Sequence, residues 1–144
     1  MKKRSLFVWL TALLVAFLAF SCGKTTKNQA DENTVVIHPS NDVLVLQSDT
    51  TFMEYLEAMK EKGLIDFTTS SGMIISVNGI ENKSTGANSM KCWMVYTSDE
   101  SQSNQAYGVL EYEGVSYASA SFGADMLIVK EEFVYILAYH EVKW

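Results

Sequence analysis

The sequence predicts an α+β fold, with one main helix and many short strands. Helical periodicity is confined to residues 51–62, whose apolar side chains lie at offsets of 0, 3, 4 and 7 (Phe52, Tyr55, Leu56 and Met59). Most of the remaining chain consists of short alternating or continuous apolar segments, separated by turn residues such as Gly, Asn and Asp, as expected of strands. Apolar residues make up 48% of the 144-residue chain, which is sufficient for a packed core.

The first 21 residues have the features of a signal peptide. Residues 2–4 are Lys-Lys-Arg, and residues 6–20 form an apolar run that only Thr11 interrupts. This run is shorter than the roughly 20 residues that a helix needs to cross a bilayer. A basic segment followed by a short apolar one is typical of export signals, so we expect the protein to work outside the cytoplasm.

Residues 18–22, Leu-Ala-Phe-Ser-Cys, resemble the cleavage site of a bacterial lipoprotein signal. In such signals the chain is cut before the cysteine, which becomes N-terminal and acylated. The resemblance implies a lipid on Cys22 and an anchor on the outer face of the cell membrane, since two or more acyl chains hold a protein there almost permanently. The alternative is an ordinary signal peptide that contains a cysteine.

Residues 22–33 contain no large apolar side chain, so we predict a flexible tether that precedes one domain at residues 34–144. Cleavage before Cys22 leaves 144 − 21 = 123 residues, the length of a single domain. The formal charge of 11 − 17 = −6 becomes 8 − 17 = −9 when residues 2–4 are lost. Such an acidic chain repels phosphate backbones, which argues against nucleic acid as a partner.

The helix of the domain has clear start and stop signals. Thr51 and Glu54 fit a capping box, and Gly63 fits a left-handed stop after the last turn. Asn78-Gly79 is typical of a two-residue hairpin, but the polar residues 81–90 predict a longer excursion instead. The predicted strands are residues 34–37, 43–46, 64–67, 73–77, 91–97, 107–112, 115–118, 126–129 and 133–140.

Two of these strands, residues 91–97 and 133–140, are apolar on both faces. One helix of about twelve residues covers only one face of a few strands. The second face is therefore covered either by residues 106–128, which fold back as another layer, or by something outside the chain. The first outcome gives a self-contained fold, and the second gives a binding platform.

The order of the segments resembles a known family. A helix near residue 52 is followed by GMIISVNGI at residues 72–80, KCWMVYT at residues 91–97, Gly108 and a final strand at residues 135–139. Over about residues 42–139 this resembles the C-terminal domain of the transcobalamin and intrinsic-factor proteins, and bacterial domains of similar sequence. The resemblance implies a β-grasp-like mixed sheet with one helix. In the vertebrate members this domain closes over a corrinoid held against a larger helical domain, which has no counterpart in this sequence.

The sequence offers no motif for catalysis or for a resident cofactor or metal. His38 and His140 are 102 residues apart, and neither has a cysteine or second histidine at ligand spacing. Cys92 lies among apolar strand residues without nearby positive charge, which favours a buried, unreactive thiol. No serine lies in a Gly-x-Ser-x-Gly elbow, and no glycine-rich phosphate loop is present. We therefore expect a protein that is not an enzyme.

Aromatic residues leave recognition as the leading function, because they bury large surfaces at little cost in side-chain entropy. We predict an extracytoplasmic binding module for a small ligand, with a corrinoid as the candidate that the resemblance implies. The alternative is a non-catalytic accessory subunit that binds another envelope protein. The candidate binding residues centre on Trp93 and the loop after it: Trp93, Tyr96, Ser98, Asp99, Tyr135 and Tyr139.

Overall fold

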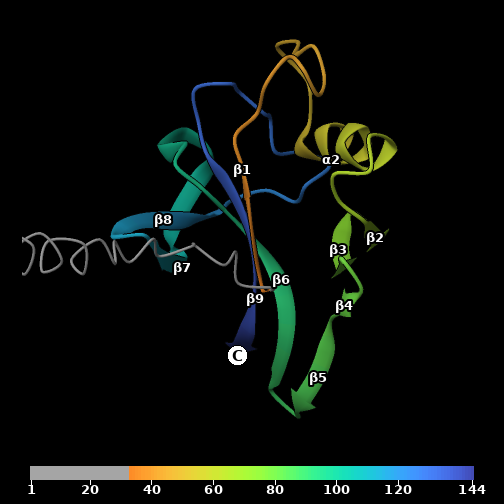
Figure 1. Ribbon diagram of the computed structural model, residues 1–144. Helices are drawn as coiled ribbons and strands as arrows, with labels where there is room; N and C mark the ends of the chain where they lie inside the picture. Colours follow the sequence, from red (N-terminus) through yellow and green to blue (C-terminus); the bar gives the residue numbers. More distant parts are fainter. Residues whose placement is uncertain (1–32) are drawn as a thin grey trace, which may run out of the picture.

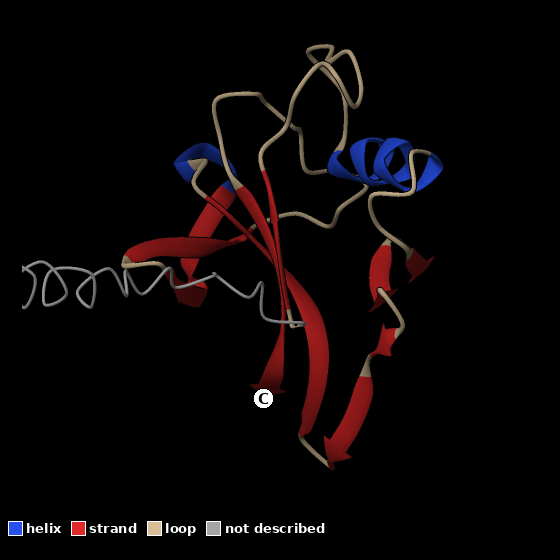
Figure 2. Cartoon of the chain, viewed as in Figure 1, coloured by secondary structure: helices blue, strands red, loops and turns tan. Residues whose placement is uncertain are grey.

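The computed structural model describes residues 33–144, so the predicted signal peptide, Cys22 and nearly all of the predicted tether lie outside the described residues. The described chain is mostly strand with one α-helix, which confirms the predicted α+β class (Figures 1 and 2). Its elements are β1 (Thr34–Ile37), α2 (Phe52–Glu61), β2 (Phe67–Ser70), β3 (Met73–Val77), β4 (Ile80–Glu81), β5 (Lys83–Gly86), β6 (Ser89–Thr97), the 3-10 helix η1 (Glu100–Gln102), β7 (Ser103–Tyr112), β8 (Val115–Ala120) and β9 (Tyr135–Lys143).

The strands form two sheets. The larger has the order β1-β9-β6-β8-β7, with β5 paired to the start of β6, and the smaller has the order β2-β3-β4. The long central pair β6–β9 runs without a register shift from Ser89↔Lys143 to Thr97↔Tyr135. Each pair recorded among the described strands is antiparallel, so the predicted mixed sheet is replaced by an antiparallel one.

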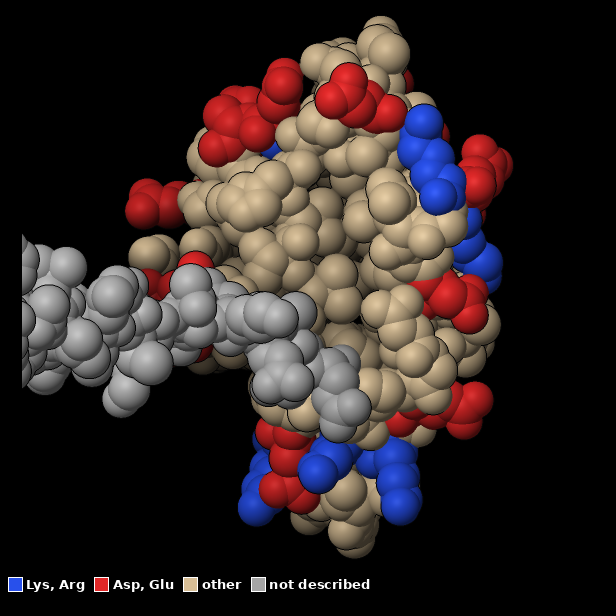
Figure 3. Space-filling view, in the orientation of Figure 1, with Lys and Arg blue, Asp and Glu red and all other residues tan. Residues whose placement is uncertain are grey.

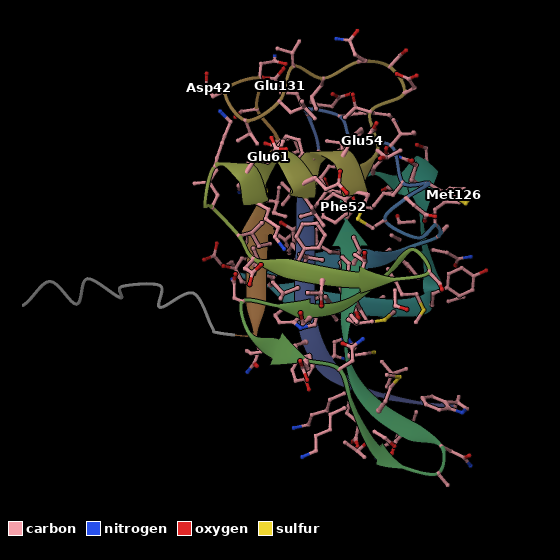
Figure 4. The ribbon with its side chains drawn as sticks, turned by 90° about the vertical axis from the view of Figure 1, so that its right-hand side faces the viewer. Asp42, Phe52, Glu54, Glu61, Met126 and Glu131 are labelled. Carbon is pink, nitrogen blue, oxygen red and sulfur yellow. The ribbon has the colours of Figure 1, made fainter. Side chains whose placement is uncertain are left out.

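The helix begins and ends as the sequence predicts. The backbone N–H of Thr51 donates to Glu54 Oε2 at 2.7 Å, and the Glu54 N–H donates to Thr51 Oγ1 at 3.2 Å, which completes the capping box. Gly63 has φ of +70° at the stop. Phe52, on the underside of α2 in Figure 4, is fully buried and stacks on Tyr135 with ring centroids 5.4 Å apart. This contact joins the helix to β9.

Two predicted strands, residues 43–46 and 126–129, are wrong. In the first, the N–H groups of Val43 and Leu44 donate back to the Ser40 carbonyl, which makes a turn. In the second, the N–H groups of residues 126 and 127 donate to the Gly123 carbonyl, and a single bridge links Ile128 to Thr51. Local turns satisfy the backbone of both segments, while several of their apolar side chains still pack on the core.

The prediction for the polar residues 81–90 is wrong in the other direction, because strands form where a polar excursion was expected. Asn78 and Gly79 have positive φ values of 48° and 84°, and Val77 pairs directly with Ile80, so a short hairpin forms where a longer excursion was predicted. The chain then continues through β5, which pairs with β6 although its side chains are polar and exposed. Similarly, β7 begins at Ser103, inside the predicted loop, and β2 lies three residues later than predicted.

The second apolar face of the central strands is covered by the chain itself. Tyr96, Ile136 and Ala138 form a buried cluster on this face, and Leu110 and Tyr117 of the β7–β8 hairpin pack on it. Figure 1 shows this hairpin on one side of β6 and β9 and α2 on the other. The β7–β8 part of residues 106–128 therefore folds back as the second layer, whereas Ala124 and Leu127 join the core under α2. This is the self-contained outcome of the two alternatives.

Candidate functional site

An open groove lies where β3, β6 and the segment after β8 meet. We call it the β3–β6 groove; its volume is about 220 Å³. Apolar atoms dominate its lining, and two of its apolar side chains, Met73 and Phe122, are 63% and 44% exposed at its rim. Among the residues that line it are Met73, Ile74, Cys92, Trp93, Met94, Val95, Ala120 and Phe122.

The groove exists because β6 has an unpaired stretch on this side. β5 pairs with β6 only as far as Lys91, and β8 begins to pair at Tyr96. Residues 92–95 therefore have no partner strand there among the described residues, although the opposite edge is fully paired with β9. The apolar side chains of β3 and of residues 120–124 face this gap in place of a strand.

Trp93 forms part of the floor of the groove, and its position is fixed from several sides. Its indole Nε1–H donates to the Ile80 carbonyl at 2.8 Å, and its backbone N–H donates to Asn82 Oδ1 at 3.0 Å. Asn82 in turn donates to the Ile74 carbonyl at 3.0 Å, and Tyr139 packs on the indole with centroids 5.3 Å apart. These contacts tie the small sheet to the large one, so the floor is rigid.

Two glycines bring the backbone close to Asp125 at one end of the groove. A Cβ on Gly72 would lie 2.8 Å from Asp125 Oδ2, and one on Gly123 would lie 2.7 Å from Asp125 Oδ1. Gly72 also has φ of +79°, a backbone conformation that disfavours other residues. The carboxylate of Asp125 therefore lies against two glycines that line the groove, although Asp125 itself is not among the lining residues.

The structure corrects the predicted exposure of the candidate binding residues. Trp93, Tyr96 and Tyr135 are buried, with 5%, 2% and 0% of their surface exposed. Tyr135 belongs to the core under α2, and Tyr96 lies on the opposite face of the sheet, so the candidates do not form one surface. Of the six, Trp93 lines the groove directly.

Tyr139 and Ser98 also make hydrogen bonds within the fold. The Tyr139 hydroxyl donates to the Glu81 carbonyl at 2.8 Å, and Ser98 Oγ accepts from the Val134 N–H at 2.9 Å. Met73 and Phe122, the exposed rim residues, were not among the predicted binding residues. Nothing in a single sequence distinguishes them from the other apolar residues of a strand and a turn.

Asp99, predicted in a binding loop, is instead a buried anchor with 2% exposure. Its carboxylate accepts from Lys130 Nζ at 2.8 Å, Ser101 Oγ at 2.5 Å and Gln102 Nε2 at 2.8 Å. Burial alone would raise the pKa of Asp99, but these hydrogen bonds outweigh it and lower the pKa to about 2. The same contact raises the pKa of Lys130. A charged Lys130 beside Ser101 is not a base, so this pair lacks the chemistry of a serine–lysine hydrolase.

A second polar cluster crosses from β6 to β9. The Tyr96 hydroxyl lies 2.6 Å from His140 Nε2, and Cys92 is paired directly with His140 in the register of the two strands. Burial raises the pKa of the Cys92 thiol, which therefore stays protonated near neutral pH. Within residues 33–144 there is no group of three or more His, Cys, Asp and Glu side chains that could hold a metal ion.

The predicted lipid anchor and the family resemblance are not tested by these contacts. Among residues 33–144, no helix is both long and apolar enough to cross a membrane. The chain matches no protein-family model, no curated protein and no solved structure.

Proposed function

We propose that the protein is a non-catalytic binding module, anchored to the outer face of the cell membrane by a lipid on Cys22, that takes an apolar ligand group in the β3–β6 groove. The observation that carries the proposal is the groove itself: an open apolar hollow beside an unpaired strand edge, with exposed Met73 and Phe122 at its mouth. Apolar lining with a few convergent polar groups is the usual make-up of a ligand site.

The size of the groove limits what it accepts. Sites for drug-sized ligands enclose about 300–1,000 Å³, and the groove, at about 220 Å³, is smaller. It suits a small apolar molecule or one apolar part of a larger one. A corrinoid, the ligand that the family resemblance implies, would place only an edge or a substituent in it. We retain the corrinoid as the specific candidate and the β-grasp-like, transcobalamin-type domain as its scaffold; one helix on one face of a sheet supports that scaffold.

The groove side chains suit a ligand whose shape is not strictly fixed. Methionine is flexible and polarizable, and it is over-used at surfaces that accept several partners. Met73, Met90 and Met94 all line the groove, above the rigid Trp93 floor. This combination supports an adaptable rim on a fixed base.

The experiment uses the full chain in detergent and a neutral apolar dye, N-phenylnaphthylamine, whose fluorescence rises when it enters an apolar site. Micelles also take up the dye, so the signal of the detergent alone is subtracted at each dye concentration. Ala120→Trp fills the groove, and Ala106→Trp, at an exposed position of β7 outside it, is the matched control. We expect the wild type and the control to bind the dye and the groove variant to bind at least about tenfold more weakly, or about 1.4 kcal/mol. Equal binding by all three proteins would contradict the proposal.

Cobalamin is tested in the same proteins. Each is incubated with cobalamin and desalted, and the visible spectrum is recorded. Corrinoid colour retained by the wild type and lost in Ala120→Trp supports the corrinoid, whereas dye binding without corrinoid colour supports another apolar ligand. The anchor is tested with Cys22→Ala: we expect loss of acyl incorporation and of membrane association, and a wild type that carries no acyl label would contradict the anchor.

A second candidate function is that of an accessory subunit that binds an envelope protein. The observation that favours it is the β7 edge of the large sheet, where Tyr107 and Val109 are 64% and 48% exposed. Exposed apolar residues on an edge strand are a common basis for protein contacts. Recovery of one membrane protein with the wild type, and its loss with Tyr107→Ser together with Val109→Ser, would favour this function over the groove.

A further inference from the structure

One end of the large sheet carries three exposed lysines on the same face. Lys83 of β5 lies directly opposite Lys91 of β6, and Lys91 lies directly opposite Glu141 of β9. Lys143 is two positions after Glu141, and side chains alternate along a strand, so all four point to one side of the sheet. We call Lys83, Lys91 and Lys143 the lysine face; Figure 3 shows lysines grouped at this end.

The positive charge of the lysine face is only partly compensated within the chain. Glu141 accepts a hydrogen bond from Thr85 Oγ1 at 3.0 Å and lies 3.4 Å from Lys143 Nζ. Neither Lys83 nor Lys91 forms a salt bridge with another of residues 33–144. Like charges directly opposite one another on paired strands are destabilising. An anionic partner outside the chain would relieve this repulsion.

The rest of the described chain has the opposite charge. Residues 81–91 and 139–144 contain the lysine face and two acidic residues, Glu81 and Glu141, which gives a formal side-chain charge of 3 − 2 = +1. The remainder of residues 33–144 contains three lysines and thirteen acidic residues, which gives 3 − 13 = −10. An anionic surface therefore attracts this end of the molecule and repels the remainder.

Trp144 adds an aromatic side chain at the same end. The residue is 68% exposed, and its backbone N–H donates to the Asn88 carbonyl at 3.1 Å, which holds it against the turn between β5 and β6. Tryptophan is enriched at membrane–water interfaces, where its ring lies at the level of the headgroups. Membrane affinity grows with attraction to anionic lipids and with the apolar area that is inserted, and this end supplies both.

The chain enters the sheet close to the lysine face. The Asn33 carbonyl accepts from the Tyr139 N–H at 2.8 Å. Tyr139 is four residues before Lys143, a distance of about 14 Å along the strand. For the predicted flexible tether, the 33 − 22 = 11 residues from Cys22 to Asn33 correspond to an end-to-end distance of about 17–20 Å. A lipid on Cys22 therefore keeps the lysine face within reach of the membrane.

We propose that the lysine face and Trp144 bind the anionic phospholipid headgroups of the membrane that holds the lipid of Cys22. The β5–β6 end then lies on the bilayer, and α2, at the opposite end of the molecule, points away from it (Figures 1 and 4). This inference rests on the lipid anchor of the proposed function. Binding is by contact of ammonium groups with phosphate, and it involves no covalent step.

The test uses the full chain, purified in its acylated form and reconstituted into vesicles of phosphatidylcholine alone or of phosphatidylcholine and phosphatidylglycerol in equal parts. Brominated phospholipids quench tryptophan fluorescence on contact, and comparison with Trp144→Phe separates Trp144 from the buried Trp93. We expect Trp144 to be quenched in the phosphatidylglycerol vesicles at low salt. Quenching should fall at least about threefold in phosphatidylcholine or at high salt, because salt screens the attraction.

A salt titration of the quenching measures how strongly single lysines contribute. Lys91→Gln should weaken the contact about fivefold, the effect of one lysine near an anionic surface. Lys62→Gln, at the exposed C-cap of α2, removes the same charge from the opposite end and is the matched control; it should behave as the wild type does. Circular dichroism checks that each variant is folded.

Equal quenching of Trp144 in the two kinds of vesicle, or equal effects of Lys91→Gln and Lys62→Gln, would overturn the proposal. Flotation with phosphatidylcholine vesicles reports on the anchor separately. A wild type that floats without quenching of Trp144 disproves the headgroup contact and leaves the anchor intact, whereas a wild type that does not float disproves both. Dye binding in the β3–β6 groove uses none of these lysines, so its outcome is independent of this one.

Discussion

Asp99 joins the loop after β6 to the segment before β9. The carboxylate is buried, and Lys130, Ser101 and Gln102 donate hydrogen bonds to it. Gln102 also spans the gap to Ile128, donating to its carbonyl and accepting from its N–H, each at about 2.7–2.8 Å. A single carboxylate thus positions three side chains, and the loss of its charge weakens the hydrogen bonds that they donate.

We predict that Asp99→Asn lowers the free energy of unfolding by about 1–3 kcal/mol, because hydrogen bonds to a charged group are among the stronger ones. The pKa of Asp99 is depressed to about 2, so the contribution of its charge is fully present above about pH 4 and is lost as the pH falls through the folded pKa. Urea unfolding of wild type and variant from pH 6 to pH 2 measures this. The difference between them should narrow below pH 4, and a constant difference would contradict the prediction.

At the scale of elements, α2 depends on its first turn. The capping box satisfies two N–H groups that have no partner within the helix. The hydrogen bond from the Thr51 backbone lowers the pKa of Glu54, which indicates that the charged carboxylate is the form that caps the helix. The Phe52 N–H, next in the chain, donates to the Leu127 carbonyl at 2.7 Å, so the cap also holds the segment before β9.

Thr51→Ala should therefore destabilise the protein by about 1 kcal/mol, the usual cost of losing an N-cap side chain. Glu54→Gln is the conservative control, since glutamine also serves at this position of a capping box, and its effect should be smaller. Thermal unfolding followed by circular dichroism at 222 nm compares them. An equal or larger loss in Glu54→Gln would contradict the expectation that a neutral glutamine preserves the box.

At the scale of the whole molecule, the β7–β8 hairpin closes the face of the sheet that α2 leaves open. Leu110 and Tyr117 pack on the buried Ile136. The bulge in β7 between Asn104 and Val109 bends the hairpin over this face and brings Gly108 against Tyr96, whose hydroxyl lies 3.6 Å from the position of a Cβ. The sheet thus covers its own second face by bending, without a second helix.

We expect Leu110→Ala to cost about 1–2 kcal/mol, less than for a fully buried leucine because Leu110 is partly exposed. In a double variant that also carries Ala120→Trp, which fills the groove, Leu110→Ala should increase the binding of an apolar dye. The reason is that it exposes the face of the sheet that the β7–β8 hairpin covers. Val109→Ala, on the exposed side of the same strand, should stay within about 0.5 kcal/mol of the wild type. Chemical unfolding measures both; equal destabilisation would show that the hairpin does not cover the core as described.

Acidic and basic side chains are interspersed over the visible surface. Figure 3 shows acidic side chains at both ends, basic ones at the upper right, and a group of lysines at the lower end, where the β5–β6 hairpin and the end of β9 lie. Lys83 pairs across the strands with Lys91, and Lys91 with Glu141, so this basic end follows from strand register. Exposed charges of this kind contribute to solubility and encounter more than to the stability of the fold.

Elements whose causes are local could be predicted from the sequence. The helix, its capping box, Gly63 and the bounds of β1 and β3 follow from the period of the apolar residues and from backbone preferences within a few positions. Export, lipidation and the family resemblance stay predictions, since they concern residues outside the described part or comparisons that found no match. Strands 43–46 and 126–129 failed because a short apolar run is also compatible with a turn that packs on the core.

The tertiary structure alone decided which residues meet. Trp93, Tyr96 and Tyr135 were all predicted to be available for binding, with Trp93 at the centre, and packing buries all three. The groove arises where β5 and β8 leave part of β6 unpaired, and Cys92 meets His140 because β9 returns antiparallel to β6. Strand pairing joins positions that are far apart along the chain, and no local pattern encodes which strand becomes the neighbour or where its partner stops.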